Sequence, residues 1–327
     1  MLQRVRSWRP TEAVLRGTFL GALVANTVIV VTGGAVRLTA SGLGCPTFPR
    51  CTDESLVATR EMGAHGAIEF GNRLLTFALS AAVLAALVTA WRAGRRDLLR
   101  PAGLLLLGIV AQALLGGVTV LTGLNPLTVM AHFLLSMGLI AVAVVAYERA
   151  AGRRVPSPDG PAATYDQALA VGASILTAAV AATLALGTVV TGTGPHSGDK
   201  QAADRLPFDL EAVTQLHADA VFLVLGLTIG LVVAAVAARA PRLLSRRLAA
   251  LLLVVLAQGL VGYVQYVTDL PVALVASHVL GACLVWIATL LVLLAAVPAR
   301  RDEGAGPAVT DEASAGSPPA RVSAAAR

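Results

Sequence analysis

The sequence predicts an all-α polytopic membrane protein, in which eight transmembrane helices form two tandem four-helix bundles. Three observations lead to this fold class: the composition, the number of long apolar stretches and an internal repeat. Of the 327 residues, 56% are hydrophobic and 13% are charged, and the mean hydropathy is +0.76. Soluble chains carry about 25% charged residues, so this chain has too few charges to cover a water-facing surface. The composition therefore excludes a soluble enzyme and indicates that a lipid bilayer surrounds most of the chain.

Eight apolar stretches are each long enough to cross a bilayer, which takes about 20 helical residues. We interpret the first as a span and not as a signal peptide, because its apolar run is longer than a typical signal segment. Proline, glycine and arginine mark the helix ends, as in RAGRRDLLRP before the third span, GLNP before the fourth, RAPRLLSRR before the seventh and DLP before the eighth. The predicted spans are 17–36, 68–91, 101–122, 127–147, 166–191, 212–238, 246–267 and 272–297.

The basic residues predict how these spans are oriented. With a cytoplasmic N-terminus, 19 of the 25 Lys and Arg residues fall on the cytoplasmic side and 6 on the other. This bias predicts that both termini are cytoplasmic. Because the basic residues lie in short clusters between apolar runs, we interpret the net charge of +6 as membrane orientation and expect no nucleic-acid partner. The use of 24 arginines against one lysine indicates a GC-rich bacterial genome, and hence a bacterial cytoplasmic membrane.

The two halves of the chain resemble each other. Residues 112–132 lie over 258–278 with a constant offset, so that Gln, Gly, Thr and His coincide, and the sequence VVTG at 30–33 returns at 189–192. Two units of four crossings each have the same orientation and are related by an axis along the membrane normal. The predicted division is a cytoplasmic arm at 1–16, an N-terminal four-helix unit at 17–150, a linker at 151–165, a C-terminal four-helix unit at 166–297 and a disordered tail at 298–327.

Three of the five histidines lie inside predicted spans: His132, His217 and His278. A lone histidine in a membrane helix is often a buried hydrogen-bonding group. His217 and His278, however, belong to the second and fourth helices of one unit, and facing histidines in a four-helix bundle are a common way to hold a haem with two axial imidazoles. Intramembrane ionisable residues are also usually functional. We therefore predict that these two histidines ligate a haem.

The N-terminal unit lacks one histidine of this pair. His132 corresponds to His278, but Asn72 stands where the C-terminal unit has His217. His65 precedes Asn72 by seven residues, which is two helical turns and roughly the same face if the helix extends so far. Otherwise His65 lies in the loop.

Glu69 and Arg73 flank Asn72 and have no counterparts in the C-terminal unit. An iron with two protein ligands suits electron transfer, whereas a site with a carboxylate and a less committed iron ligand suits the binding and conversion of a substrate. The simpler alternative is that Glu69 and Arg73 form an ion pair that caps the outer end of the second span.

Cys45 and Cys51 lie in the long first outer loop, in the sequence GLGCPTFPRC. An extracytoplasmic compartment is oxidising, so a disulfide can persist there and would tie the loop down over the first site. Two free thiols or a metal pair are the alternatives.

Taken together, these residues resemble the heme A synthase family. The resemblance covers roughly residues 17–297 and is carried by the eight spans in two units, by TGGAVRLTASGLGCPTFPRC after the first span, by IEFGNR in the second and by the three histidines within spans. It implies oxidation of the C8 methyl group of haem O to a formyl group, which gives haem A for terminal oxidases. The family's disulfide-forming pair matches Cys45 and Cys51.

The resemblance also assigns the two haem sites. It implies that His217 and His278 are the axial ligands of a haem b cofactor in the C-terminal unit. Haem O would then bind as substrate in the N-terminal unit, with His132 as a ligand and Glu69 near the reacting methyl group. Many members carry a histidine at the position of Asn72, so either His65 takes its place here or the site works with His132 alone.

Further partners follow from the same resemblance. Haem O synthase would supply the substrate and terminal oxidase assembly would receive the product, while the electron donor or acceptor is not identified. Arg37, Arg73 and Arg205 are expected near haem propionates, because guanidinium pairs well with carboxylates. The alternative function is a di-haem membrane cytochrome for electron transfer only, which leaves Glu69 and the cysteine loop without a role. A transporter would need broken helices at mid-membrane, and none are evident.

Overall fold

The structure, a computed structural model, describes residues 9–153, 164–196, 198–199 and 204–296. Every regular element in these ranges is helical. A single 3-10 turn, η1 (Arg60–Met62), precedes α3. The α-helices are α2 (Glu12–Leu38), α3 (Gly63–Arg92), α4 (Arg96–Leu121), α5 (Pro126–Ala150), α6 (Thr164–Thr193), α7 (Leu210–Ala237), α8 (Arg242–Val267) and α9 (Val272–Ala296).

Within the described residues, eight helices are long and apolar enough to cross a membrane. The prediction of an all-α polytopic membrane protein is therefore confirmed. The helices extend the predicted spans by up to five residues at their ends, because polar and basic residues continue the hydrogen-bonded turns beyond the apolar core. The N-terminal arm is shorter than predicted, since α2 begins at Glu12 and the Thr11 side chain caps it by accepting from the Val14 N–H at 3.3 Å.

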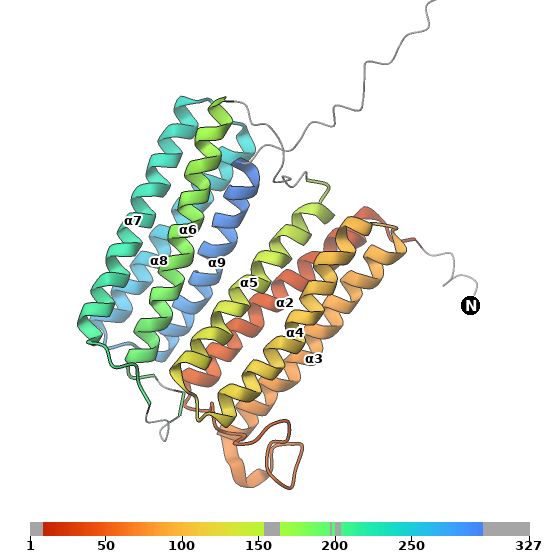
Figure 1. Ribbon diagram of the computed structural model, residues 1–327, viewed down its shortest axis with the longest axis vertical. Coiled ribbons are helices and arrows are strands. Elements are labelled where there is room, and N and C mark those ends of the chain that lie inside the picture. The colour runs from red at the N-terminus through yellow and green to blue at the C-terminus, as the bar shows by residue number, and fades with distance from the viewer. Residues whose placement is uncertain (1–8, 154–163, 197, 200–203, 297–327) are drawn as a thin grey trace, which may run out of the picture.

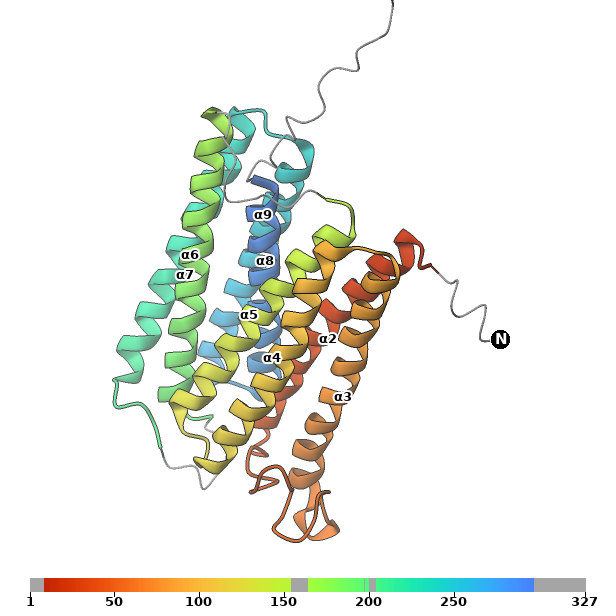
Figure 2. The ribbon, with the colours of Figure 1, turned by 45° about the vertical axis from the view of Figure 1, so that its right-hand side comes forward.

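The eight helices form two four-helix bundles, as predicted (Figure 1, Figure 2). In the N-terminal unit the ring order is α2, α3, α4, α5, and each helix packs on its two neighbours in the ring. The C-terminal unit repeats this with α6, α7, α8 and α9. Thus α3 lies diagonally opposite α5, and α7 lies diagonally opposite α9. Most of the predicted linker 151–165 and the whole tail 298–327 lie outside the described residues.

The two units pack on each other through three helix pairs of similar extent, which are α2 with α9, α5 with α9 and α5 with α6. The Trp286 indole N–H donates to the Met137 carbonyl at 2.9 Å across this interface. Near the ends of α5 and α8, the buried Glu148 forms an ion pair with Arg247. The interface thus contains both apolar packing and buried polar contacts that join the halves of the repeat.

Pro101 lies inside α4, whereas the sequence predicted that the third span begins at residue 101. Proline has no N–H to donate to the carbonyl four residues earlier, which here belongs to Asp97. Arg149 of α5 donates to that Asp97 carbonyl at 3.4 Å instead, and Arg95 donates to the Arg149 carbonyl at 3.0 Å. The neighbouring helix therefore supplies the donor that proline lacks, and the helix begins five residues earlier.

Candidate functional site

His217 and His278 project from the diagonal helices α7 and α9 of the C-terminal unit. His217 is the eighth residue of α7 and His278 the seventh of α9, so both lie about 10 Å along their helices from the same end of the bundle. We call this end of the molecule the loop end; it carries residues 39–59 and the described residues 194–196 and 204–209, and Figure 1 shows the first of these loops below α3 and α4.

A glycine on a neighbouring helix supports each of the three intramembrane histidines. A Cβ on Gly116, Gly187 or Gly262 would lie 3.3, 3.2 or 3.1 Å from the Cε1 atom of His132, His217 or His278, respectively. These distances are tighter than ordinary contacts, so a side chain at any of the three positions would displace the ring by a few tenths of an ångström. The repeat shows Gly116 and Gly262 at equivalent positions, but the sequence did not reveal that they contact the histidines.

The imidazoles fit ligation of a haem iron. Among the described residues, the Nδ1 atoms of His132, His217 and His278 are buried and have no hydrogen-bond partner. For His132 and His278 the edge that contains Nδ1 rests against the glycine, while Nε2 is turned away from it. A buried ring nitrogen without a partner is costly in an apolar environment, whereas a ring held at one edge with Nε2 turned away from the supporting glycine suits axial ligation.

Two equivalent glutamines link α4 to α5 and α8 to α9 by hydrogen bonds at the level of the histidines. The Gln112 amide donates to the His132 carbonyl at 3.1 Å, and the Gln258 amide donates to the His278 carbonyl at 2.8 Å. The repeat places these glutamines at the same position of α4 and α8. The hydrogen bonds therefore set the position of α5 and α9 against their partners at the level of the imidazoles.

The repeat places Asn72 in the position that His217 occupies in the other unit. Asn72 lies on α3, diagonally opposite the helix of His132, and a Cβ on Gly33 of α2 would be 3.9 Å from its Nδ2 atom. Its Oδ1 atom is buried and has no hydrogen-bond partner within the part of the chain that the structure describes. The N-terminal unit thus has a histidine and an amide where the C-terminal unit has two histidines.

His65 is the third residue of α3, so the helix does extend this far and the loop placement is wrong. Its ring is exposed, and its Nδ1 atom lies 3.0 Å from the Ser41 hydroxyl. Seven residues of helix separate it from Asn72, which is about 10 Å along the axis. The structure therefore places His65 at the loop end and does not bring it beside Asn72.

Glu69 and Arg73 form the ion pair that the simpler alternative predicted, with 2.5 Å between Arg73 Nη2 and Glu69 Oε1. The pair also binds the first loop. Glu69 Oε2 accepts from the Cys45 N–H at 2.5 Å, and Arg73 donates to the Cys45 and Thr47 carbonyls at 3.0 and 3.2 Å. Glu69 is therefore a buried carboxylate that anchors the loop to α3.

Cys45 and Cys51 form a disulfide, so the alternatives of free thiols and of a metal pair are wrong. Both cysteines are fully buried. The bridge closes the loop segment that Glu69 and Arg73 hold. As a result, the loop at residues 39–59 is closed on itself by one covalent bond and is held on α3 by several hydrogen bonds.

The other two arginines expected near haem propionates lie at the loop end. Arg37 donates to the carbonyls of His196 and Thr191 at 2.6 and 2.8 Å. Arg205 donates to the Pro195 carbonyl at 3.2 Å and interacts electrostatically with Arg37. Arg37 thus binds backbone of the last turn of α6 and of the loop that follows it, and Arg205 binds backbone of that loop.

Comparison with known proteins shows the family of the chain. Residues 17–197, more than half of the chain, match the sequence model of the cytochrome oxidase assembly protein family. The chain belongs to this family. The matched segment includes the disulfide loop, Glu69, Asn72 and His132.

Two curated relatives carry the name heme A synthase. The chain is 30% identical over 123 residues to the protein of Geobacillus kaustophilus, which is 37% of this chain and 38% of the relative. It is 34% identical over 129 residues to the protein of Lysinibacillus sphaericus, which is 38% of this chain and 41% of the relative. The match therefore spans about two fifths of the length of each relative.

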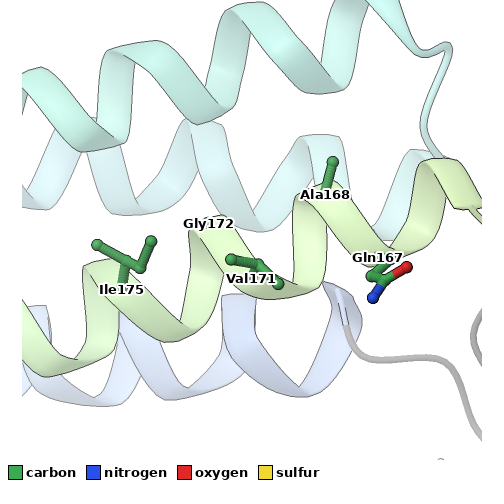
Figure 3. A pocket seen from close by; sticks show the side chains of 5 residues that line it. All are labelled: Gln167, Ala168, Val171, Gly172 and Ile175. Atoms are coloured by element: carbon green, nitrogen blue, oxygen red, sulfur yellow. The ribbon is translucent and has the colours of Figure 1, made fainter.

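A depression on the outside of α6 is separate from the histidine sites described above. Figure 3 shows its lining side chains along one face of the helix, where Val171 and Ile175 are each 52% exposed. It lies at least twelve residues, about 18 Å, before Gly187. Its lining is apolar except for one amide, which suits contact with lipid. The lining residues are Gln167, Ala168, Val171, Gly172 and Ile175.

Phe48 is a site residue that the sequence did not reveal. It lies within the disulfide loop, and its ring packs on Gly117 of α4, where a Cβ would be 2.6 Å from Phe48 Cδ1. Gly117 follows Gly116, which supports His132. In the C-terminal unit the equivalent of Gly117 is Tyr263, which is exposed. The Gly-Gly pair was the available signal, because it occurs only in the unit that the cysteine loop covers.

We expect the substitution Gly117→Ala to push Phe48 and the disulfide loop away from α4. Overpacking of this kind costs about 1–3 kcal/mol, so the apparent melting temperature in detergent should fall. The matched control is Gly103→Ala on the same helix, since a Cβ there meets no atom within 4 Å. The double variant with Phe48→Ala should regain the lost stability. Equal melting temperatures for Gly117→Ala and Gly103→Ala would show that Phe48 is not packed as described.

Proposed function

We propose that this chain is a heme A synthase, which oxidises the C8 methyl group of haem O to a formyl group and so makes haem A for terminal oxidases. Membership of the family and the names of the two relatives support this proposal. The observation that carries it is the asymmetry of the two units. One presents a pair of histidines, and the other presents one histidine, one amide and a buried carboxylate at the same level of the bundle.

The C-terminal unit would hold haem b between His217 and His278. When bound there, this cofactor supplies one-electron transfer between the substrate site and an electron acceptor that is not identified. The protein's part is to hold both imidazoles against Gly187 and Gly262. Two protein ligands leave such a centre without a place for substrate, which suits electron transfer.

The N-terminal unit would bind haem O as substrate, with His132 as the ligand from α5. Conversion of the methyl group to a formyl group takes up two water molecules and releases four electrons and four protons, and it passes through an alcohol and a hydrated aldehyde that then loses one water molecule. Glu69 can accept a proton or stabilise positive charge at the methyl carbon. The geometry favours the second role, because uptake of a proton would break the contacts of Glu69 with Arg73 and with the Cys45 N–H.

The remaining expectations belong to the same proposal. The chain would lie in a bacterial cytoplasmic membrane with both termini in the cytoplasm, so that the loop end faces the oxidising side. The buried disulfide at that end is consistent with this orientation. Haem O synthase would provide the substrate, and assembly of the terminal oxidase would take up the product. Arg37, Arg73 and Arg205 remain the proposed propionate partners, although each already donates to backbone carbonyls.

The haem content of the purified protein tests this function. The full chain is co-expressed with a haem O source and purified in detergent, and the extracted haems are identified by mass. Haem A or its hydroxylated precursor is expected beside haem b. Haem b alone would favour the electron-transfer cytochrome, and the absence of any haem would show that the histidines have another role.

We expect Glu69→Gln to lower haem A formation about 100-fold, because a fixed charge at a reacting group contributes factors of this order. Glutamine keeps an oxygen that can accept from the Cys45 N–H, so the loop should stay folded. Glu61→Gln is the matched control, since Glu61 is an exposed carboxylate in η1. Rates are measured by haem mass together with the fraction of protein that contains the disulfide. Haem A formation at the parental rate would exclude Glu69 from the reaction.

A further inference from the structure

We infer that the N-terminal unit ligates haem O through the imidazole of His132 alone, and that Asn72 faces this haem as a hydrogen-bonding group and not as a replaced or missing ligand. The inference rests on the proposed function and specifies how its substrate is bound. It concerns position 72, where the N-terminal unit has an asparagine and the C-terminal unit has the imidazole of His217 at the equivalent position.

The position of Asn72 is the first step. Its helix α3 and the helix of His132, α5, are diagonal in the ring, as α7 and α9 are for His217 and His278. A Cβ on Gly33 of the preceding helix would be 3.9 Å from Asn72 Nδ2, an ordinary contact, whereas a Cβ on Gly187 would be 3.2 Å from His217 Cε1. The repeat and the ring order therefore put the amide in the place of the second imidazole, with a looser contact to the neighbouring helix.

The second step is the hydrogen bonding of the amide. The Oδ1 atom of Asn72 is buried and has no donor within the described residues. A carboxamide oxygen accepts hydrogen bonds and is left unsatisfied in native proteins only rarely. It therefore calls for a partner with an O–H group, such as a water molecule or the hydroxyl of a hydroxymethyl haem. Both belong to the chemistry of the proposed reaction.

The third step excludes the other ligands in reach. His65 is the only other histidine of residues 9–153, and it lies about 10 Å nearer the loop end with its Nδ1 atom at the Ser41 hydroxyl. Glu69 is held by Arg73 and by the Cys45 N–H. His65 cannot reach the level of Asn72 without unfolding the first turns of α3, and Glu69 could ligate an iron only by giving up the contacts that hold the disulfide loop.

A single protein ligand also suits a group that is a substrate. The product must leave the unit after each turnover, and one ligand bond is easier to break than two. The haem between His217 and His278 is a cofactor that stays, and it has two imidazoles. The unit with Asn72 would thus bind the haem that must leave, and the unit with His217 would bind the haem that stays.

Carbon monoxide binding to the reduced, purified full-length protein tests the inference. The haem in the N-terminal unit should bind carbon monoxide, and the haem between His217 and His278 should not. Asn72→His should abolish this binding and give a second six-coordinate, low-spin spectrum. Asn72→Leu, which has a similar volume but no ligating atom, should keep it. His65→Ala should leave it unchanged.

Two results would overturn the inference. One is a protein with two haems by mass that binds no carbon monoxide, in particular if His65→Ala then creates the binding. The other is binding of carbon monoxide that appears only in Asn72→Leu, which would make Asn72 a ligand. A parental protein with haem b alone would overturn the proposed function as well, and the haem masses distinguish that case from the failure of the inference by itself.

Discussion

His278→Ala is expected to remove haem b from the C-terminal unit and to abolish haem A formation. A bis-histidine haem depends on both imidazoles, and α9 offers no second ligand at this level. The remaining imidazole, His217, would be buried in an apolar bundle without its counterpart. We expect the low-spin haem spectrum to fall at least tenfold per protein, while haem bound in the N-terminal unit remains. Difference spectra and extracted haem masses measure both.

Two further variants keep this prediction testable if His278→Ala is unstable. Gly262→Ala would place a Cβ 3.1 Å from His278 Cε1, so it should tilt the ring and lower the haem b content while the fold remains. Gly259→Ala on the same helix is the matched control, because a Cβ there meets no atom within 4 Å. Full haem b content in both His278→Ala and Gly262→Ala would mean that His278 is not an axial ligand.

Glu148→Gln is expected to destabilise the protein by about 3–5 kcal/mol, the cost of leaving one buried ion without its partner. Glu148 is 2% exposed at the end of α5 and pairs with Arg247 of α8, which also donates to the Leu291 carbonyl at 2.7 Å. Arg153 lies 2.5 Å from the other carboxylate oxygen. The substitution would leave Arg247 buried between the two units with no carboxylate, so the interface through α5 and α9 should weaken.

Unfolding in detergent measures this effect. The control is Asp97→Asn, which breaks the exposed pair with Arg95 and should cost less than about 1 kcal/mol. A double variant, Glu148→Leu with Arg247→Met, should recover much of the loss, because apolar residues can replace a buried ion pair. If Glu148→Gln is as stable as Asp97→Asn, the pair does not hold the two units together.

Much of the fold could be predicted, because the bilayer imposes a simple rule. A spanning segment must satisfy its own backbone hydrogen bonds and cover about 30 Å with apolar side chains. This is why the eight spans were identified within a few residues. Pro101 was misplaced because the donor for the Asp97 carbonyl comes from Arg149, 52 residues away.

The candidate site could be predicted only in part. The repeat identified two pairs of equivalent positions, His132 with His278 and Asn72 with His217. Equivalent positions of a repeat lie at the same depth in the two bundles. It could not show that glycines support the imidazoles. Nor could it place Phe48 on Gly117, because that contact joins a loop to a helix about 70 residues further along the chain.

The sequence by itself determined the eight spans, the two units and the residue types at each of four equivalent positions, because these depend on local composition and on the repeat. Only the tertiary structure decided that Glu69 and Arg73 hold the disulfide loop, that His65 stays at the loop end, and that Glu148 pairs with the other unit. These contacts depend on which helix faces meet and on which buried polar atoms find partners. Packing of distant segments decides both, and no local pattern records it.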